Sequence, residues 1–140
     1  MKADILIVDD DADSREALGR FLTKAGHSVR AAEDGHEALH LLGTAIPDLI
    51  VLDYRMPKAD GVSVLYVLRS YLRWATVPVV ILTAYPDEPR LAGLEHLGVE
   101  RVFTKSHFRM EELVDFIEER IQPRISHEVY ADGLLSQPNL

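Results

Sequence analysis

The chain has 140 residues, and 47% of them are hydrophobic, so it has room for one domain with a full hydrophobic core and not for a second. Its formal net charge is −8 and it has no Lys/Arg run, which argues against direct nucleic-acid binding, because neutralising phosphates needs a basic face. The absence of cysteine excludes disulfides, thiolate zinc sites and thiol catalysis.

The first predicted element is a short strand over Asp4–Val8 that runs directly into Asp9, Asp10 and Asp11. An apolar run of this length, ended by three acids, is too short for a signal peptide or a membrane span. We therefore expect a cytoplasmic protein that does not contact a membrane.

The next three elements are a helix, a strand and a second helix. The segment Asp13–Glu16 has the spacing of a capping box and opens a helix that Gly26 ends. Residues 28–32 alternate weakly, as an edge strand does. Asp34–Gly35 opens the second helix.

The central element is the run Leu49–Leu52, which delivers Asp53 to its end. A short run of branched apolar residues is typical of a strand that is buried on both faces. In open parallel sheets, ligands bind at the carboxyl ends of the strands. Asp53 is therefore the leading candidate for a functional residue.

The second half of the chain repeats the alternation. Two prolines restrict the start of the predicted fourth helix, and Gly98 ends it. Thr83 follows the fourth strand, and Lys105 follows the fifth. These elements are expected at residues 62–74 (helix), 79–82 (strand), 88–98 (helix), 101–103 (strand) and 109–122 (helix).

Five strand-helix alternations predict an α/β fold, a doubly wound five-stranded parallel sheet with helices on both faces. This domain is expected to cover residues 1–122. Residues 123–140 change in composition and are expected to be a docked extension, a partner-binding strip or a linker.

Acidic, hydroxyl and amino side chains end four of the strands, at Asp9, Asp10, Asp53, Thr83 and Lys105. In this chain order they resemble the receiver domain of two-component response regulators, and the resemblance covers residues 2 to about 122. It implies a flavodoxin-like sheet with strand order 2-1-3-4-5. It also implies a phosphorylation-dependent switch.

The resemblance implies a role for each of these side chains. Asp53 is the phosphoacceptor, and Thr83 and Lys105 meet the phosphoryl group. Mg²⁺ (or Mn²⁺) is the implied cofactor, which suits oxygen ligands. Two adjacent carboxylates at the end of a buried strand also repel each other and need a cation. The implied metal ligands are Asp9, Asp10, Asp53 and the backbone carbonyl of Arg55.

By the same resemblance the chain turns over no metabolite and shows only slow self-catalysed phosphotransfer and autodephosphorylation. Its implied phosphodonor is a histidine kinase or a histidine phosphotransfer protein. Its output would be a downstream protein partner or a self-dimer through the face made by the fourth helix, fifth strand and fifth helix.

The sequence departs from the receiver pattern beside the site. Ser106 follows the lysine where most members have a cis proline, and Val102 replaces a switch aromatic. Valine is too short and too stiff to report a rotamer change. We therefore expect the loop from Thr83 to Pro89, with Ala84 and Tyr85, to be the moving element.

Two alternatives stay open from the sequence: a pseudo-receiver that binds partners without phosphorylation, and a haloacid-dehalogenase-type phosphohydrolase that uses Asp9-x-Asp11. The second leaves Asp53 unexplained. A calcium loop at Asp9 fails, because Ser14 and Arg20 stand where glycine and glutamate are needed. The six histidines have no metal-ligand spacing and are expected at the surface.

Overall fold

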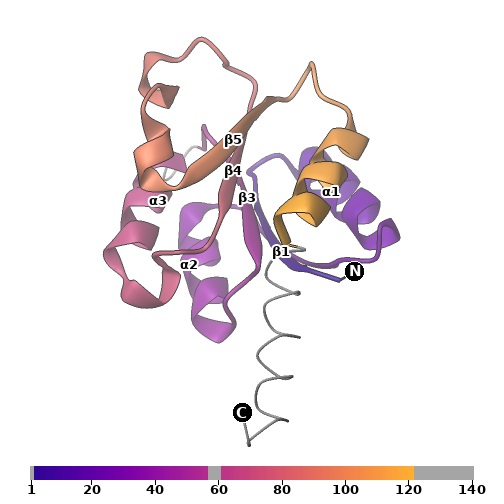
Figure 1. The fold of residues 1–140 in the computed structure, drawn as a ribbon, viewed down its shortest axis with the longest axis horizontal. Coiled ribbons are helices and arrows are strands. Elements are labelled where there is room, and N and C mark those ends of the chain that lie inside the picture. The colour runs from indigo at the N-terminus through magenta and orange to yellow at the C-terminus, as the bar shows by residue number, and fades with distance from the viewer. Residues whose placement is uncertain (1, 57–60, 122–140) are drawn as a thin grey trace, which may run out of the picture.

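The computed structural model describes residues 2–56 and 61–121. Its centre is one parallel sheet in the order β2-β1-β3-β4-β5, as expected from the sequence (Figure 1). The strands are β1 (Asp4–Val8), β2 (Ser28–Ala32), β3 (Leu49–Asp53), β4 (Val79–Thr83) and β5 (Val99–Thr104).

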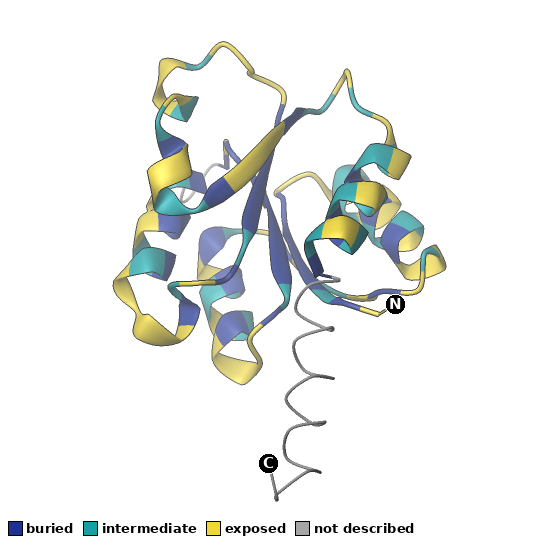
Figure 2. Cartoon of the chain, in the orientation of Figure 1, coloured by how far each residue is buried: buried dark blue, intermediate teal, exposed yellow. Residues whose placement is uncertain are grey.

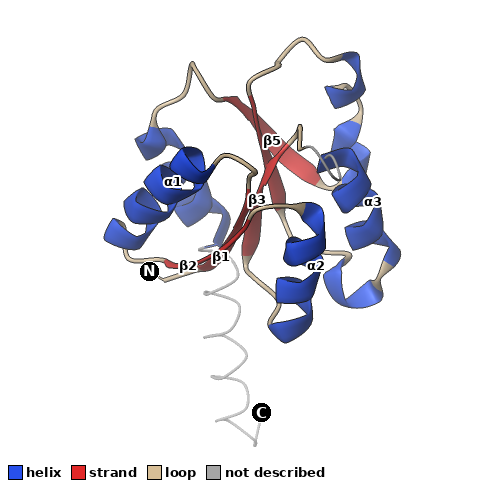
Figure 3. Ribbon diagram, turned by 180° about the vertical axis from the view of Figure 1, so that it is seen from behind, coloured by secondary structure: helices blue, strands red, loops and turns tan. Residues whose placement is uncertain are grey.

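Helices cover both faces of this sheet. α1 (Ala12–Lys24) and a helix over residues 110–121 lie on one face, and α2 (Gly35–Thr44) and α3 (Gly61–Ser70) lie on the other (Figures 1 and 3). This is the doubly wound arrangement that the alternation of elements predicts. Among the described residues, no helix has the length and apolarity needed to cross a membrane.

Strand periodicity produces two separate cores. Ile5 and Ile7 of β1 join the cluster that contains Leu22 of α1, whereas Leu6 and Val8 join the cluster on the opposite face. Successive side chains of a strand point to opposite faces. β3 and β4 are therefore buried along their whole length and β1 is buried beyond Asp4, which gives the dark blue centre of Figure 2.

The start of α1 differs from the prediction. Asp11 is the N-cap, and its carboxylate accepts a hydrogen bond from Asp13 N at 3.2 Å. The expected capping box at Asp13–Glu16 is therefore wrong, because the helix already begins at Ala12. α2 begins as predicted, with Asp34 accepting from Glu37 N at 2.8 Å.

The predicted fourth helix over residues 88–98 is also wrong. The segment forms two short 3₁₀ turns, Pro89–Leu91 and Leu94–Leu97. Gly93 lies between them with φ 83°, in the left-handed region that an α-helix does not use. The backbone therefore changes direction in the middle of the predicted helix.

The Arg69 side chain holds this segment against the end of α3. Its guanidinium donates to backbone carbonyls within residues 74–77, which follow α3, and to those of residues 97 and 98, at distances of 2.6 to 3.4 Å. Five carbonyls that no α-helix satisfies accept hydrogen bonds from one cation. They belong to Trp74, Ala75, Val77, Leu97 and Gly98.

Smaller corrections concern element ends and one histidine. The third helix ends at Ser70 and is followed by a 3₁₀ turn at Leu72–Trp74, and β5 begins two residues earlier than predicted. His27 is buried rather than exposed, and its Nδ1 accepts a hydrogen bond from Ala3 N at 3.1 Å. The predicted tail at 123–140 lies outside the described residues.

Candidate functional site

The carboxyl ends of four neighbouring strands converge at one edge of the sheet. Asp9 follows β1, Asp53 ends β3, Thr83 ends β4 and Lys105 follows β5. The pairs β1-β3, β3-β4 and β4-β5 are all parallel neighbours. The register therefore brings together side chains that the sequence separates by up to about a hundred positions.

Three carboxylates form a cluster at this edge. Within the described residues, Asp9, Asp10 and Asp53 each offer an oxygen, and these atoms lie within 4.8 Å of one another. Asp9 and Asp53 are buried, while Asp10 is exposed. All the donors are carboxylate oxygens, so the cluster suits a hard divalent cation such as Mg²⁺ that keeps water ligands on its open side.

The environment of Asp53 makes its charge unfavourable. Burial, with the nearby charge of Asp9 added, raises its pKa to about 7, against the opposing effect of Lys105. A buried anion beside a second anion is stabilised by any cation that enters the cluster. With a pKa of about 7, Asp53 is partly protonated at neutral pH unless a cation in the cluster favours its charged form.

Lys105 supplies the positive charge on the β5 side. Its Nζ lies 3.0 Å from Asp9 Oδ2 and 3.6 Å from Asp53 Oδ2. Burial lowers the pKa of Lys105, but hydrogen bonds and charges from the two aspartates outweigh burial and raise it. Its backbone N–H donates to Thr83 O at 2.7 Å, which fixes the lysine beside the end of β4.

An open cleft of about 580 Å³ gives access to this cluster. Its walls carry both acidic and basic groups, so an anion that enters it meets cations from more than one direction. Asp9 and Thr83 are not among its lining residues, whereas the expected switch residues Ala84 and Tyr85 are. The lining residues are Asp10, Asp53, Arg55, Met56, Ala84, Tyr85, Arg90 and Lys105.

A second charged group lies at the mouth of the cleft and was missed by the sequence analysis. Arg55 Nη2 lies 3.2 Å from Glu88 Oε2, and Arg90 Nε lies 3.7 Å from Glu88 Oε1. The Arg55 guanidinium also lies 4.3 Å from the ring centroid of Tyr85. The Arg55 hydrogen bond lowers the pKa of Glu88. No sequence pattern links two residues 33 positions apart, so only the fold reveals this contact.

The remaining candidate residues lie as follows. Thr83 Oγ1 accepts a hydrogen bond from Tyr85 N at 2.9 Å, and its hydroxyl can still donate to an anion. Val102 is 39% exposed, beside Ile81 in the register, where the predicted fourth helix does not cover it. The described residues contain no cis peptide, so the Lys105–Ser106 bond is trans.

Comparisons with known proteins agree with this geometry. The model of the response regulator receiver domain family matches residues 5–118. The response regulator MprA of Mycolicibacterium vanbaalenii is 43% identical over 115 residues, which are 81% of this chain and 48% of that protein.

Solved structures of the same kind superpose on the chain. The Francisella response regulator 1452 receiver domain has a TM-score of 0.78 and 30% identity, and the match covers 87% of this chain and 98% of that one. The Vibrio cholerae chemotaxis protein CheY4 has a TM-score of 0.77 and 27% identity, with 85% and 98% covered.

The chain spans about half the length of the curated relatives that it matches. The comparisons therefore do not support the expectation that nucleic acid is excluded as a partner, because the other half of those relatives has no counterpart here. The family model covers most of the present sequence, and the strand order and the polar strand ends agree with it. The chain belongs to the response regulator receiver domain family of two-component signalling.

Proposed function

We propose that this receiver is a phosphorylation-dependent switch in which Asp53 is the phosphoacceptor. The observation that carries the proposal is that Asp53 lines an open cleft beside two further carboxylates and the Lys105 ammonium. The donor is the phosphohistidine of a kinase or a phosphotransfer protein. A bond forms from an Asp53 carboxylate oxygen to phosphorus, the phosphorus–nitrogen bond breaks, and its electron pair stays on the imidazole.

Mg²⁺ or Mn²⁺ fits the acidic cluster and would screen the anionic phosphoryl oxygens. Asp9, Asp10 and Asp53 would hold it, with the Arg55 backbone carbonyl as a fourth protein ligand. The support is the oxygen-only donor set within 4.8 Å and the raised pKa of Asp53. Removal of the phosphoryl group by water at the same site gives slow autodephosphorylation rather than metabolic turnover.

Lys105 and Thr83 complete the surroundings of the phosphoryl group. The ammonium is already placed 3.6 Å from the Asp53 oxygen, where it can pair with a phosphoryl oxygen. The Thr83 hydroxyl ends the adjacent strand and can donate to another oxygen. Rotation of the Thr83 side chain toward the phosphoryl group would also carry Oγ1, which accepts from Tyr85 N, so phosphorylation disturbs the loop that follows β4.

The output of the switch is a change in the loop from Thr83 to Pro89, with Tyr85 as its reporter. Tyr85 is half-exposed and lines the cleft, whereas Val102 lies outside it. The partner is a downstream protein, or a second copy, that binds β5, the helix over residues 110–121 and the segment between β4 and β5. The cytoplasmic location stays a prediction.

Beryllofluoride with Mg²⁺ separates this proposal from its rivals. We expect saturable NMR changes in the wild type that are absent in Asp53→Asn. A pseudo-receiver predicts no change in either protein. A phosphohydrolase that uses Asp9 predicts that the changes persist in Asp53→Asn. In the same experiment the Tyr85→Ala variant should lose more of the response than Val102→Ala, and the reverse result would contradict the role of Tyr85.

A further inference from the structure

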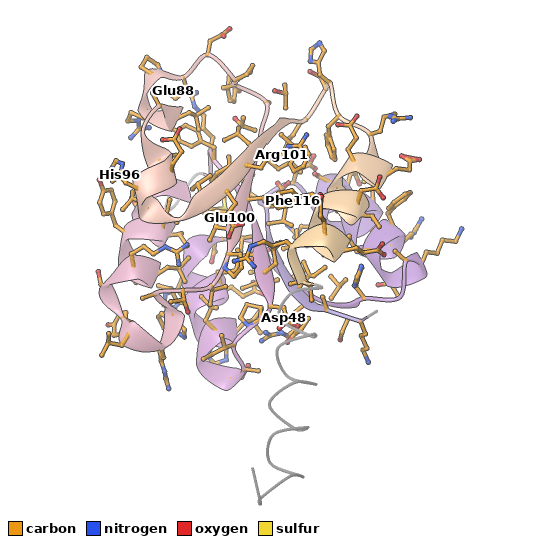
Figure 4. All side chains as sticks on the ribbon, in the orientation of Figure 1. Asp48, Glu88, His96, Glu100, Arg101 and Phe116 are labelled. Carbon is orange, nitrogen blue, oxygen red and sulfur yellow. The ribbon has the colours of Figure 1, made fainter. Side chains whose placement is uncertain are left out.

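The charged group at the mouth of the cleft joins two segments that the sheet does not connect. Arg55 follows β3, whereas Tyr85 and Glu88 lie on the segment after β4. Figure 4 shows Glu88 on this segment, near the end of the sheet where the strand ends converge. The Arg55 ion pair and its contact with the Tyr85 ring are therefore a bridge across the opening of the cleft.

The two partners of this ion pair differ in freedom. The Arg55 side chain is 54% exposed, while that of Glu88 is 17% exposed. Glu88 also keeps Arg90 as a second cation, 3.7 Å away on its other oxygen. If the pair opens, Arg55 is the partner that moves, and the Glu88 carboxylate is not left without a cation.

Phosphorylation changes the charge that Arg55 meets in the cleft. Three carboxylates, one ammonium and one divalent cation are balanced in formal charge. A phosphoryl group on Asp53 carries a charge of about −2 in place of a single carboxylate charge. The cleft then has excess negative charge, and Arg55 is a flexible cation that already lines it.

We propose that Glu88 is a resident anion that holds Arg55 across the mouth of the cleft, and that the phosphoryl group on Asp53 competes with Glu88 for this guanidinium. This proposal rests on the function of Asp53 proposed above. Movement of Arg55 onto the phosphoryl group breaks the bridge and takes the guanidinium away from Tyr85. The segment after β4 then loses its contact with the segment after β3.

The weakness of the resident contact allows it to act as a switch. A partly exposed ion pair contributes little, so an anion in the cleft can reverse it. A ligand shifts an equilibrium only through its different affinity for the two states. Here the phosphoryl group favours the open bridge, and Glu88 favours the closed one.

The test is a double-mutant cycle on beryllofluoride affinity, measured by NMR titration of the full chain at constant Mg²⁺. Glu88→Gln keeps the side-chain shape and removes the charge, so we expect binding about threefold tighter than in the wild type. Arg55→Gln should bind more weakly. In the Arg55→Gln background, Glu88→Gln should then have no effect.

A matched control is Glu100→Gln. Glu100 is also paired with an arginine, Arg120, at 2.6 Å, but it lies on β5 away from the cleft (Figure 4). This variant should leave the affinity for beryllofluoride unchanged, because it also loses one carboxylate charge but leaves the Arg55–Glu88 pair intact. In the wild type, the Arg55 Nε–H signal should move on beryllofluoride binding, which shows that this side chain changes partner.

Two outcomes overturn the inference alone. If Glu88→Gln tightens binding equally with and without Arg55, the effect comes from the loss of a negative charge near the cleft or acts through Arg90. If the Arg55 signal does not move while Asp53 binds beryllofluoride, no exchange takes place. A wild type that binds no beryllofluoride, or an Asp53→Asn variant that still binds it, instead overturns the proposed function on which the inference rests.

Discussion

The two sides of the cleft are built in different ways. On one side, buried strands carry Asp9 and Asp53 into a crowded, charged cluster with Lys105. On the other side, the segment over residues 84–98 has no α-helix. Leu94 anchors it in the core, and the side chains of Arg69 and Arg55 hold it through polar contacts. The strands give the site a fixed geometry, while the exposed start of the segment, over residues 84–87, has no core side chain and can change its position. Three predictions test this difference.

The largest expected effect concerns the charge on Asp53. Without metal, its pKa of about 7 lies above the ordinary value of 3.8, so the folded state binds more protons between these values. The protonated Asp53 carboxyl therefore makes its full contribution to the free energy of unfolding below about pH 4. This contribution is lost as the pH rises to about 7, and the loss is at most about 4 kcal/mol. Asp53→Asn should remove this pH dependence.

Urea unfolding between pH 4 and 8 in the presence of EDTA measures this effect. Asp115→Asn, which changes an exposed acid on the last described helix, is the control and should keep the wild-type slope. If the stability of the wild type does not fall over this range, or if that of Asp53→Asn falls equally, the charge on Asp53 is not unfavourable in the folded protein.

The second effect concerns Arg69 on the other side. Arg69→Gln leaves up to four backbone carbonyls without a donor, because Trp74 O still accepts from Val77 N, and should lower the free energy of unfolding by about 2 kcal/mol. Arg73→Gln, at an exposed arginine nearby, should change it by less than about 0.5 kcal/mol.

Hydrogen exchange locates this effect. In Arg69→Gln, exchange should accelerate over residues 84–98 and stay unchanged in β1 and β3. Equal acceleration in the central strands would show that the segment and the acidic side form one cooperative unit. The distinction between the two sides would then fail.

The third and smallest effect is stabilisation by Mg²⁺. Ligand linkage predicts about 1.4 kcal/mol at a Mg²⁺ concentration about ten times the dissociation constant. The gain in the free energy of unfolding should depend on the three carboxylates of the acidic cluster. It should therefore shrink in Asp10→Asn, which lacks the charge of one proposed ligand. A Tm that does not rise in millimolar Mg²⁺, or that rises equally in Asp10→Asn, would contradict the metal site.

The strands and the acidic residues could be predicted because local patterns determine them. Leu49–Leu52 is a continuous apolar run that ends in an acid, and the strand order follows from the resemblance to receivers. Parallel pairing then places Asp9, Asp53 and Lys105 at one edge. The raised pKa of Asp53 depends on how deeply its carboxyl is buried. The sequence indicates that the strand is buried but not how deeply its last side chain lies.

The segment after β4 could not be predicted in the same way. Leu91, Leu94 and Leu97 have helical spacing, but the left-handed backbone at Gly93 separates them into two turns. Arg69 compensates through contacts with carbonyls nearly 30 positions away. Such side-chain to backbone contacts leave no periodic signal in the sequence, and the Arg55–Glu88 pair has the same character.

The central claim is that Asp53 accepts a phosphoryl group with help from a divalent cation and Lys105. The most direct measurement is the intact mass of the protein after incubation with acetyl phosphate and Mg²⁺. The wild type should gain the mass of one phosphoryl group, and Asp53→Asn or added EDTA should abolish this gain. Lys105→Ala should stay folded, but the structural response of its phosphorylated form should differ from that of the wild type. A phosphoryl group that still appears in Asp53→Asn, or none in the wild type, would contradict the account.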